Sequence, residues 1–180
     1  MLRTQAPPDQ PDYRDPPLIE IRPAGHGDAA EIRNFINGLS LRTQFLRFFA
    51  SVAPPSPGLL RGLYGADGNA DVIIATRCGS VIGHAMAVDR TGADGLRASD
   101  VGVVVTDRWQ QRGLGSALLR DVVDRAAARG VQTLVMDVLR SNDQMLAMIE
   151  RRWPGSRREP DGNSVTIRTC LRPAGAGQRA

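Results

Sequence analysis

The chain has 180 residues, of which 42% are hydrophobic and 23% charged, a composition typical of a soluble globular protein with one domain-sized core. The net charge of +4 mildly favours anionic partners, but aromatic residues make up only 4% and the arginines are scattered, so we expect no nucleic acid partner. No apolar run reaches the roughly 20 residues that span a bilayer, and the N-terminus lacks an apolar signal-peptide core, so we expect no membrane partner and a cytoplasmic location.

Both ends of the chain differ in composition from its middle. Residues 1–17 contain five prolines and few apolar side chains, which predicts a disordered tail, and residues 173–180 predict another. Between them, residues 18–172 are expected to form a single domain. Within it, Cys78 and Cys170 are far apart in sequence, and we expect two buried free thiols in a reducing cytosol rather than a disulfide.

The first part of the domain predicts one strand followed by helices. Residues 18–24 alternate and predict the strand, after which Asp28 is a candidate N-cap for a helix. The apolar face of that helix is formed by Ile32, Phe35, Ile36 and Leu39. Residues 41–51 predict a second short helix, whose phenylalanines are expected to pack inward, and residues 59–64 a further helical turn.

The second part is richer in strands. We expect strands over residues 70–78, 80–90, 99–106, 131–139 and 163–171, with a short extra strand near 156–159. One helix begins at Gly113 and ends at Gly130, and another is capped by Ser141 or Asn142 and stopped by Pro154. This order predicts a mixed α/β fold in which helices flank a mixed sheet.

A glycine pair, Gly113 and Gly115, opens the helix that follows the apolar strand ending at Val105. Free N–H groups and the helix dipole at such a position bind phosphate. A nucleoside-triphosphate loop needs a lysine after its second glycine, and the chain contains no lysine, because all 23 basic residues are arginine. We interpret that bias as codon usage in a high-GC bacterial genome. A dinucleotide loop of an NAD(P)-dependent oxidoreductase is a weaker alternative, because seven residues separate Val105 from Gly113 and the candidate ribose-binding Asp137 lies inside a strand.

A third interpretation fits this segment better. The segment 105–115, in which Gln110 is followed by Gly113 and Gly115, resembles the acyl-CoA pyrophosphate loop of the GNAT superfamily of N-acetyltransferases. In that superfamily the pattern is glutamine or arginine, two residues, glycine, one residue, then glycine or alanine, between a strand and a helix. The resemblance covers roughly residues 18–171. The segments "GLSLRTQFLRFF" and "VLRSNDQMLAMIERRW" are also similar to regions of the bacterial protein-lysine acetyltransferases of this superfamily.

The resemblance implies a fold and an activity. The implied fold is a central, mostly antiparallel sheet with a splayed parallel pair, flanked by helices. The implied enzyme transfers an acetyl group from acetyl-CoA, its co-substrate, to a primary amine by direct attack in a ternary complex, with no metal. The amine acceptor is a small molecule or a protein lysine, and a homodimer is a further expectation. A non-catalytic acyl-CoA-binding sensor or subunit is the alternative.

The resemblance also assigns residues to the coenzyme. The phosphates are expected on the backbone N–H groups of Gln111, Arg112, Gly113, Leu114, Gly115 and Ser116, after the motif residue Gln110. The pantetheine arm is expected along Val103, Val104 and Val105, with Asn142 as a further contact. A backbone N–H near Val104 is the expected donor to the thioester oxygen in the transition state.

The chemistry needs a base, because an amine with a pKa of about 10.4 is neutral in only about one part in a few thousand at pH 7. Asp100 occupies the position where relatives often carry a glutamate, and we expect it to act through a bridging water. His84 is the second candidate, because the usual pKa of histidine suits the role. Many relatives carry a tyrosine as the acid seven residues after the asparagine, whereas this chain has Ile149 there.

Two further groups have expected places, the first from its spacing and the second from the resemblance. Met145 and Met148 have helical spacing and are expected in the core rather than against substrate. The arginines of the segment that shapes the acceptor site in relatives, among them Arg42, Arg47 and Arg61, are candidates for selecting an acidic acceptor.

Overall fold

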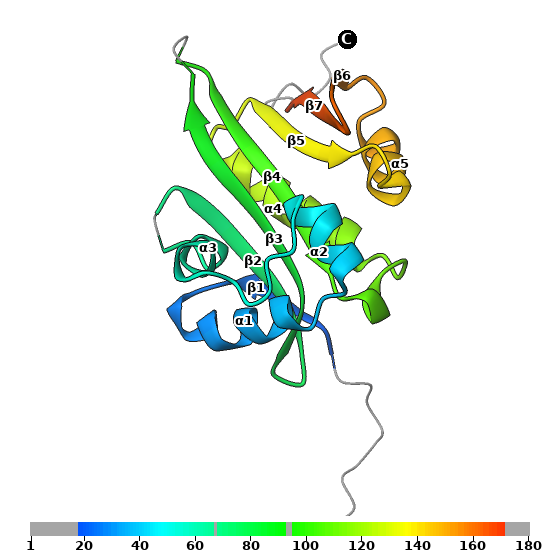
Figure 1. The fold of residues 1–180 in the computed structure, drawn as a ribbon. Coiled ribbons are helices and arrows are strands. Elements are labelled where there is room, and N and C mark those ends of the chain that lie inside the picture. The colour runs from blue at the N-terminus through cyan, green and yellow to red at the C-terminus, as the bar shows by residue number, and fades with distance from the viewer. Residues whose placement is uncertain (1–17, 67, 93–94, 172–180) are drawn as a thin grey trace, which may run out of the picture.

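The computed structural model describes residues 18–66, 68–92 and 95–171, so the predicted tails 1–17 and 173–180 lie outside the described residues (Figure 1). The helices are α1 Ala29–Asn37, α2 Leu41–Phe48, α3 Pro57–Leu63, α4 Leu114–Ala128 and α5 Asp143–Arg152. The strands are β1 Glu20–Pro23, β2 Ala70–Arg77, β3 Ser80–Thr91, β4 Arg97–Val105, β5 Thr133–Leu139, β6 Arg157–Asp161 and β7 Ser164–Cys170. Every element expected from the sequence is present, with bounds shifted by a few residues.

The strands form one mixed sheet in the order β1-β2-β3-β4-β5-β7-β6. In the described chain only β4 and β5 run parallel, and every other neighbouring pair is antiparallel. The predicted fold class is therefore confirmed. A dinucleotide-binding fold is built on a mostly parallel sheet, so the topology does not fit the oxidoreductase alternative.

Helices cover both faces of the sheet (Figure 1). On one face, α4 buries a stripe at helical spacing formed by Leu114, Leu118, Leu119, Val122, Val123 and Ala126, which packs with Ala75, Ala85 and Ala87 from β2 and β3. Small residues on the strands let the helix approach closely, and at Gly83 a Cβ would come within 2.7 Å of Leu118 Cδ1. On the other face, α1 and α3 bury Ile32, Ile36 and Leu63 against Ile74 and Val104. The core thus occupies both sides of β2, β3 and β4.

The parallel pair separates soon after it begins. Strands β4 and β5 pair only from Ala98 with Thr133 to Asp100 with Val135, and β4 then continues to Val105 without a partner on that side. Its other edge stays paired with β3 along the whole strand, and β5 stays paired with β7. Past Asp100, two facing strand edges are therefore open to a ligand between them.

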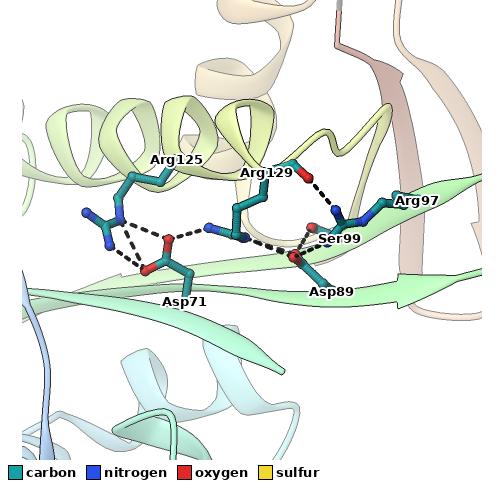
Figure 2. Close-up of polar contacts among 6 residues, drawn as sticks. All are labelled: Asp71, Asp89, Arg97, Ser99, Arg125 and Arg129. Atoms are coloured by element: carbon teal, nitrogen blue, oxygen red, sulfur yellow. Dashed lines mark hydrogen bonds and ion pairs between the residues drawn. The ribbon is translucent and has the colours of Figure 1, made fainter. Parts of the chain in front are cut away.

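A network of ion pairs fastens the C-terminal end of α4 to the sheet (Figure 2). Arg129 donates to both Asp71 on β2 and Asp89 on β3, and its Nε lies 2.9 Å from Asp89 Oδ2. Arg125 holds Asp71 with two nitrogens, from Nε at 2.9 Å and from Nη2 at 2.9 Å, while Ser99 donates to Asp89. Burial alone raises the pKa of Asp89, but the hydrogen bonds from Arg129 and Ser99 outweigh it and lower that pKa below its usual value.

Replacing Arg129 by methionine is expected to lower the free energy of unfolding by about 1.5–3 kcal/mol, because two mostly buried carboxylates lose a charged donor. Arg120→Met, at an exposed position of the same helix, is the control and should change stability by less than about 0.5 kcal/mol. Because the pKa of Asp89 is lowered in the folded state, its contribution is complete above the usual aspartate pKa of about 3.9 and is lost as pH falls below it. Urea unfolding at pH 7 and pH 3 measures both effects, and equal losses in the two variants would refute the assignment.

Three details differ from expectation. Cys78 and Cys170 are free, as predicted, but both are exposed rather than buried, because one lies in the β2–β3 turn and the other ends β7 beyond the last residue that pairs with β6. Phe45 and Phe49 are also exposed, since α2 turns Phe48 toward the core cluster instead. Asp28 precedes α1 without capping it through its side chain, because its carboxylate pairs with Arg22.

None of the described helices is long and apolar enough to cross a membrane.

Candidate functional site

Two adjoining cavities lie at the opening between β4 and β5. The first has a volume of about 630 Å³ and reaches the glycine turn, and the second has a volume of about 360 Å³ and reaches Asp100. Their linings share Leu46, Arg47, Val103, Asn142 and Met145. A long ligand in the first cavity would therefore present its end to the second.

Most of the residues assigned to the coenzyme line the first cavity. They are Val103, Val104, Val105, Gln110, Gln111, Gly113, Gly115, Ser116 and Asn142. Leu114 instead points into the core, so only its backbone can serve a ligand, and Arg112 stacks its guanidinium on the Trp109 ring at 5.2 Å. The structure thus brings nine of the eleven residues together without showing what they bind.

The glycine turn has an unusual backbone. Gln111 has a φ of 58° and Gly113 a φ of 81°, both in the left-handed region. A Cβ at Gly113 would meet no atom within 4 Å, so conformation rather than space calls for glycine there. Gly115 has an ordinary helical backbone, and a Cβ there would lie 3.7 Å from Val105 Cγ2, an ordinary contact.

The N–H groups of this turn are available to a ligand. Within the described chain, no carbonyl or side chain accepts from the N–H groups of residues 111–116, and the first intrahelical bond of α4 runs from Ala117 to Gly113. These donors lie at the positive end of a helix of 15 residues, where a helix favours an anion. The arrangement suits a diphosphate.

Exchanging the two glycines for alanine is expected to have opposite effects on stability. Gly113→Ala should lower the free energy of unfolding by about 1–2 kcal/mol, because alanine is strained in the left-handed region. Gly115→Ala should raise it by about 0.5–1 kcal/mol, because alanine is a better helix former and the site has room. Urea unfolding of both variants tests this, and two changes of the same sign would contradict the backbone assignment.

A polar cluster joins the glycine turn to α2. Asp107 Oδ1 accepts from the hydroxyls of Ser40 at 2.7 Å and Thr43 at 2.9 Å. The Gln110 amide donates to Thr43 Oγ1 and to the Val105 carbonyl, both at 3.1 Å. Burial raises the pKa of Asp107, but these hydroxyl donors outweigh it and lower that pKa below its usual value. Through these bonds the Gln110 side chain connects the end of β4 to α2 on the wall of the first cavity.

Asp100 lies where β4 and β5 separate, on the wall of the second cavity. Its Oδ1 is 2.8 Å from Arg90 Nη2, and the carboxylate remains half-exposed. Burial raises the pKa of Asp100, the charge of Asp137 raises it further, and the charges of Arg90 and Arg168 partly oppose the shift. A carboxylate with a raised pKa on the wall of a cavity is suited to accept a proton.

His84 is placed differently from Asp100. It is fully buried and lines neither cavity, and its Nε2 makes a hydrogen bond of 2.8 Å to the Leu63 carbonyl. Burial lowers the pKa of His84 to about 4, so the ring is neutral at physiological pH. This geometry does not support the second candidate for the base and indicates a structural side chain between β3 and α3.

Among the residues that the structure describes, no tyrosine takes the place of the acid that relatives carry. Ile149 is fully buried in the α4-side core cluster, and the Tyr64 ring packs at a tilt of 52° against the His26 ring, with centroids 5.0 Å apart. Tyr64 lines neither cavity. Among the described residues, no tyrosine therefore lies where it could protonate a leaving group.

Sequence reasoning missed several side chains of the cavity walls. Met145 and Met148, expected in the core, pack against it but also line the first cavity, as does Arg151 on the same helix. Arg47 was one of three arginines considered for the acceptor, and it alone of the three lines a cavity. The position of Arg47 could have been suspected from Gly102 on β4. A lone glycine inside a strand often marks the close approach of another group, here the guanidinium of Arg47.

Comparisons with known proteins agree with this architecture. The model of the acetyltransferase (GNAT) family matches residues 40–152, more than half of the chain. A search of curated protein sequences gives no match. Among solved structures, the GNAT domain of PAT from S. lividans is 25% identical, with a TM-score of 0.75 over 85% of this chain and 90% of that one.

Two further neighbours were solved with acetyl-CoA. The yncA protein of Salmonella typhimurium is 18% identical, with a TM-score of 0.68 over 91% of this chain and 99% of that one. A phosphinothricin acetyltransferase from Sinorhizobium meliloti is 17% identical, with a TM-score of 0.68 over 90% and 93%. At these identities the likeness shows the fold. Taken with the family model, the open parallel pair and the glycine turn, it shows that the chain belongs to the GNAT family of acetyltransferases.

Proposed function

We propose that this chain transfers an acetyl group from acetyl-CoA to a primary amine by direct attack in a ternary complex. The observation that carries the proposal is the continuous path from free N–H groups at the start of α4, along the open edge of β4, to the carboxylate of Asp100. Both the donor and the acceptor have a place on that path. The acetyl-CoA complexes of the two neighbours support the choice of coenzyme.

The first cavity suits the coenzyme in shape and in hydrogen-bonding groups. The turn around Gly113 supplies N–H donors for the diphosphate, and the unpaired edge of β4 supplies backbone groups for the two amides of the pantetheine arm. Asn142 lies at the start of α5 on the same cavity, and its side chain also caps the helix by accepting from the Met145 N–H at 3.2 Å. The two expected roles of Asn142 are compatible.

The reaction requires one proton to move and one bond to be exchanged. The thioester supplies the acyl group: a C–N bond to the amine forms as the C–S bond breaks, and the thiolate leaves with the electron pair. In our proposal Asp100, directly or through a water, takes the proton of the attacking amine. A β4 backbone N–H near Val104 stabilises the developing negative charge on the oxygen. A thiolate is a good leaving group at neutral pH, so the absence of a tyrosine acid does not prevent the reaction.

The acceptor of this proposal is a primary amine, carried by a small molecule or by a protein lysine. The cytoplasmic location and the homodimer remain predictions, and β6, the outer strand next to β7, forms one edge of the sheet. The non-catalytic acyl-CoA-binding module remains the alternative, and the buried Ile149 at the position of the family's tyrosine is the observation that favours it.

A turnover assay distinguishes an acetyltransferase from a non-catalytic acyl-CoA-binding module. Release of free thiol from acetyl-CoA is followed with polyamines, amino acids, aminoglycosides and lysine peptides, while the thermal shift with coenzyme A is recorded on the same sample. Amine-dependent thiol release, with N-acetyl product found by mass spectrometry, supports the enzyme. A concentration-dependent thermal shift without transfer to any acceptor overturns it in favour of the binding module.

A further inference from the structure

Arg47 stands at the meeting point of the two cavities. It comes from α2, crosses to β4 and lines both cavity walls. Its guanidinium lies against the backbone of Gly102, where a Cβ would overlap it. The missing side chain of Gly102 therefore provides the space that the guanidinium fills, two residues along β4 from Asp100.

The guanidinium has no counter-ion among the described residues. Its Nε is wholly buried without a hydrogen-bond partner, and the guanidinium carbon lies 4.9 Å from the centroid of the Phe48 ring. Burial lowers the pKa of Arg47 to about 10, which still leaves it charged at neutral pH. Arg47 as a whole is partly exposed to solvent. An unpaired charge that has lost most of its contact with water is still costly, so a fold that keeps one beside a cavity is suited to an anionic ligand.

The nearby carboxylates are engaged elsewhere. Asp100 pairs with Arg90 at 2.8 Å, and Asp137 accepts from the Thr166 hydroxyl at 2.6 Å. The second cavity thus has a cation where it meets the coenzyme cavity, with Asp100 and Asp137 also on its wall. Its volume of about 360 Å³ is that of a site for a small molecule.

We propose that Arg47 binds the carboxylate of the acceptor, which is an amino acid or a similar small molecule with an amine and a carboxylate close together. This inference rests on the proposed acetyl transfer and names its substrate class. The bound carboxylate places the amine between the guanidinium and Asp100, next to the shared wall of the two cavities. A lysine side chain brings an ammonium and no carboxylate, so it leaves the charge of Arg47 unpaired.

A carboxylate at this position has a second possible source. Arg47 also lines the coenzyme cavity, so a dicarboxylic acyl group such as succinyl would offer the same chemistry from the donor side. The two sources differ in which substrate must carry the carboxylate. The test therefore varies the donor and the acceptor separately.

The acceptor arm compares amino acids with the amines that lack only the carboxylate, such as leucine with isoamylamine and tryptophan with tryptamine. We expect wild type to favour the amino acid in kcat/KM by about 100-fold, and Arg47→Gln to remove most of that preference. Arg42→Gln, at an exposed position of the same helix, is the matched control and should keep it. Gly102→Ala should reproduce the loss with Arg47 still present, because the added methyl displaces the guanidinium.

The donor arm compares succinyl-CoA with acetyl-CoA for the carboxylate-free amines. A preference of wild type for succinyl-CoA that Arg47→Gln removes would overturn the inference in favour of the donor. Turnover of plain amines and amino acids at equal rates, unchanged in Arg47→Gln, would overturn it while leaving the proposed acetyl transfer intact.

A binding measurement keeps the inference testable without turnover. N-acetyl amino acids are titrated into the complex with coenzyme A by calorimetry, with the matching N-acetyl amines as controls. Binding that needs the carboxylate and falls about 100-fold in Arg47→Gln supports the inference even if no acceptor is acetylated, in which case only the proposed function fails. Equal binding to wild type and Arg47→Gln overturns it, and unchanged melting temperatures show that the variants fold.

Discussion

Asp100→Asn is expected to lower kcat at pH 7 by about 10²- to 10⁴-fold, which is the usual contribution of a positioned general base. Asparagine keeps the shape of the side chain but accepts no proton at this pH. The variant then depends on the small fraction of amine that is already neutral. The loss of kcat in Asp100→Asn relative to wild type should therefore shrink as pH approaches the pKa of the acceptor amine. Acceptors whose amine has a lower pKa should restore part of kcat.

The pH profile of wild type follows from the charges that face Asp100. Burial and Asp137 on β5 raise its pKa, whereas Arg90 on β3 and Arg168 on β7 lower it, and Arg47 on α2 adds a further positive charge to the same cavity. The base must be ionised, so activity is lost as pH falls through this raised pKa, above the usual aspartate range. The acid limb of kcat/KM should move to lower pH in Asp137→Asn and to higher pH in Arg90→Gln.

These measurements distinguish a base from a merely structural aspartate. If Asp100 only anchors Arg90, then Asp100→Asn and Arg90→Gln should have similar effects and neither should move the acid limb. An Asp100→Asn enzyme with the wild-type pH profile would remove this residue from the mechanism.

Ser116→Asp is expected to weaken the binding of coenzyme A by about 100-fold while stabilising the free protein. Ser116 is at the third position of α4, where an acidic side chain accepts from free N–H groups and complements the helix dipole. Such a cap should raise the free energy of unfolding by about 0.3–1 kcal/mol. The same carboxylate takes the donors that the diphosphate needs and repels its charge.

The control is Ser116→Asn, which adds nearly the same volume without the charge. Calorimetry with coenzyme A and urea unfolding of the ligand-free protein measure the two quantities. A gain in stability with a loss of affinity, found in the aspartate variant and much reduced in the asparagine variant, supports the diphosphate site at α4. Undiminished affinity in Ser116→Asp would mean that the coenzyme binds elsewhere.

The elements of this fold could be predicted because each obeys a local pattern. Alternation in β1, the apolar runs of β2 to β4, the helical stripe of α4 and the stop at Gly130 are all properties of neighbouring residues. The glycine turn was equally readable, since a left-handed Gly113 at a helix start is a local requirement. Asp100 could be named from its place in the motif, although its charged neighbours come from three other strands.

The parts that could not be predicted depend on contacts between distant segments. Arg47 is one of 23 basic residues, all arginine, and only the approach of α2 to Gly102 makes it the one that lies unpaired between two cavities. The burial of His84 depends on α3, which is a separate element in the sequence and whose Leu63 carbonyl accepts the hydrogen bond from the imidazole. Exposure of Cys170 depends on where β6 stops pairing with β7, which is at Arg168, two residues before Cys170.

The hydrogen bonds of Asp107 and Gln110 to Ser40 and Thr43 have a consequence for the order in which two substrates arrive. They tie the first turn of α2 to the segment that precedes Gly113, so a coenzyme that immobilises this segment also immobilises the helix that carries Arg47. An acceptor that binds after the coenzyme meets a helix α2 that is already ordered. An acceptor that binds before the coenzyme loses binding free energy to the entropy cost of ordering α2. This connection favours compulsory-order kinetics with the nucleotide as the leading substrate.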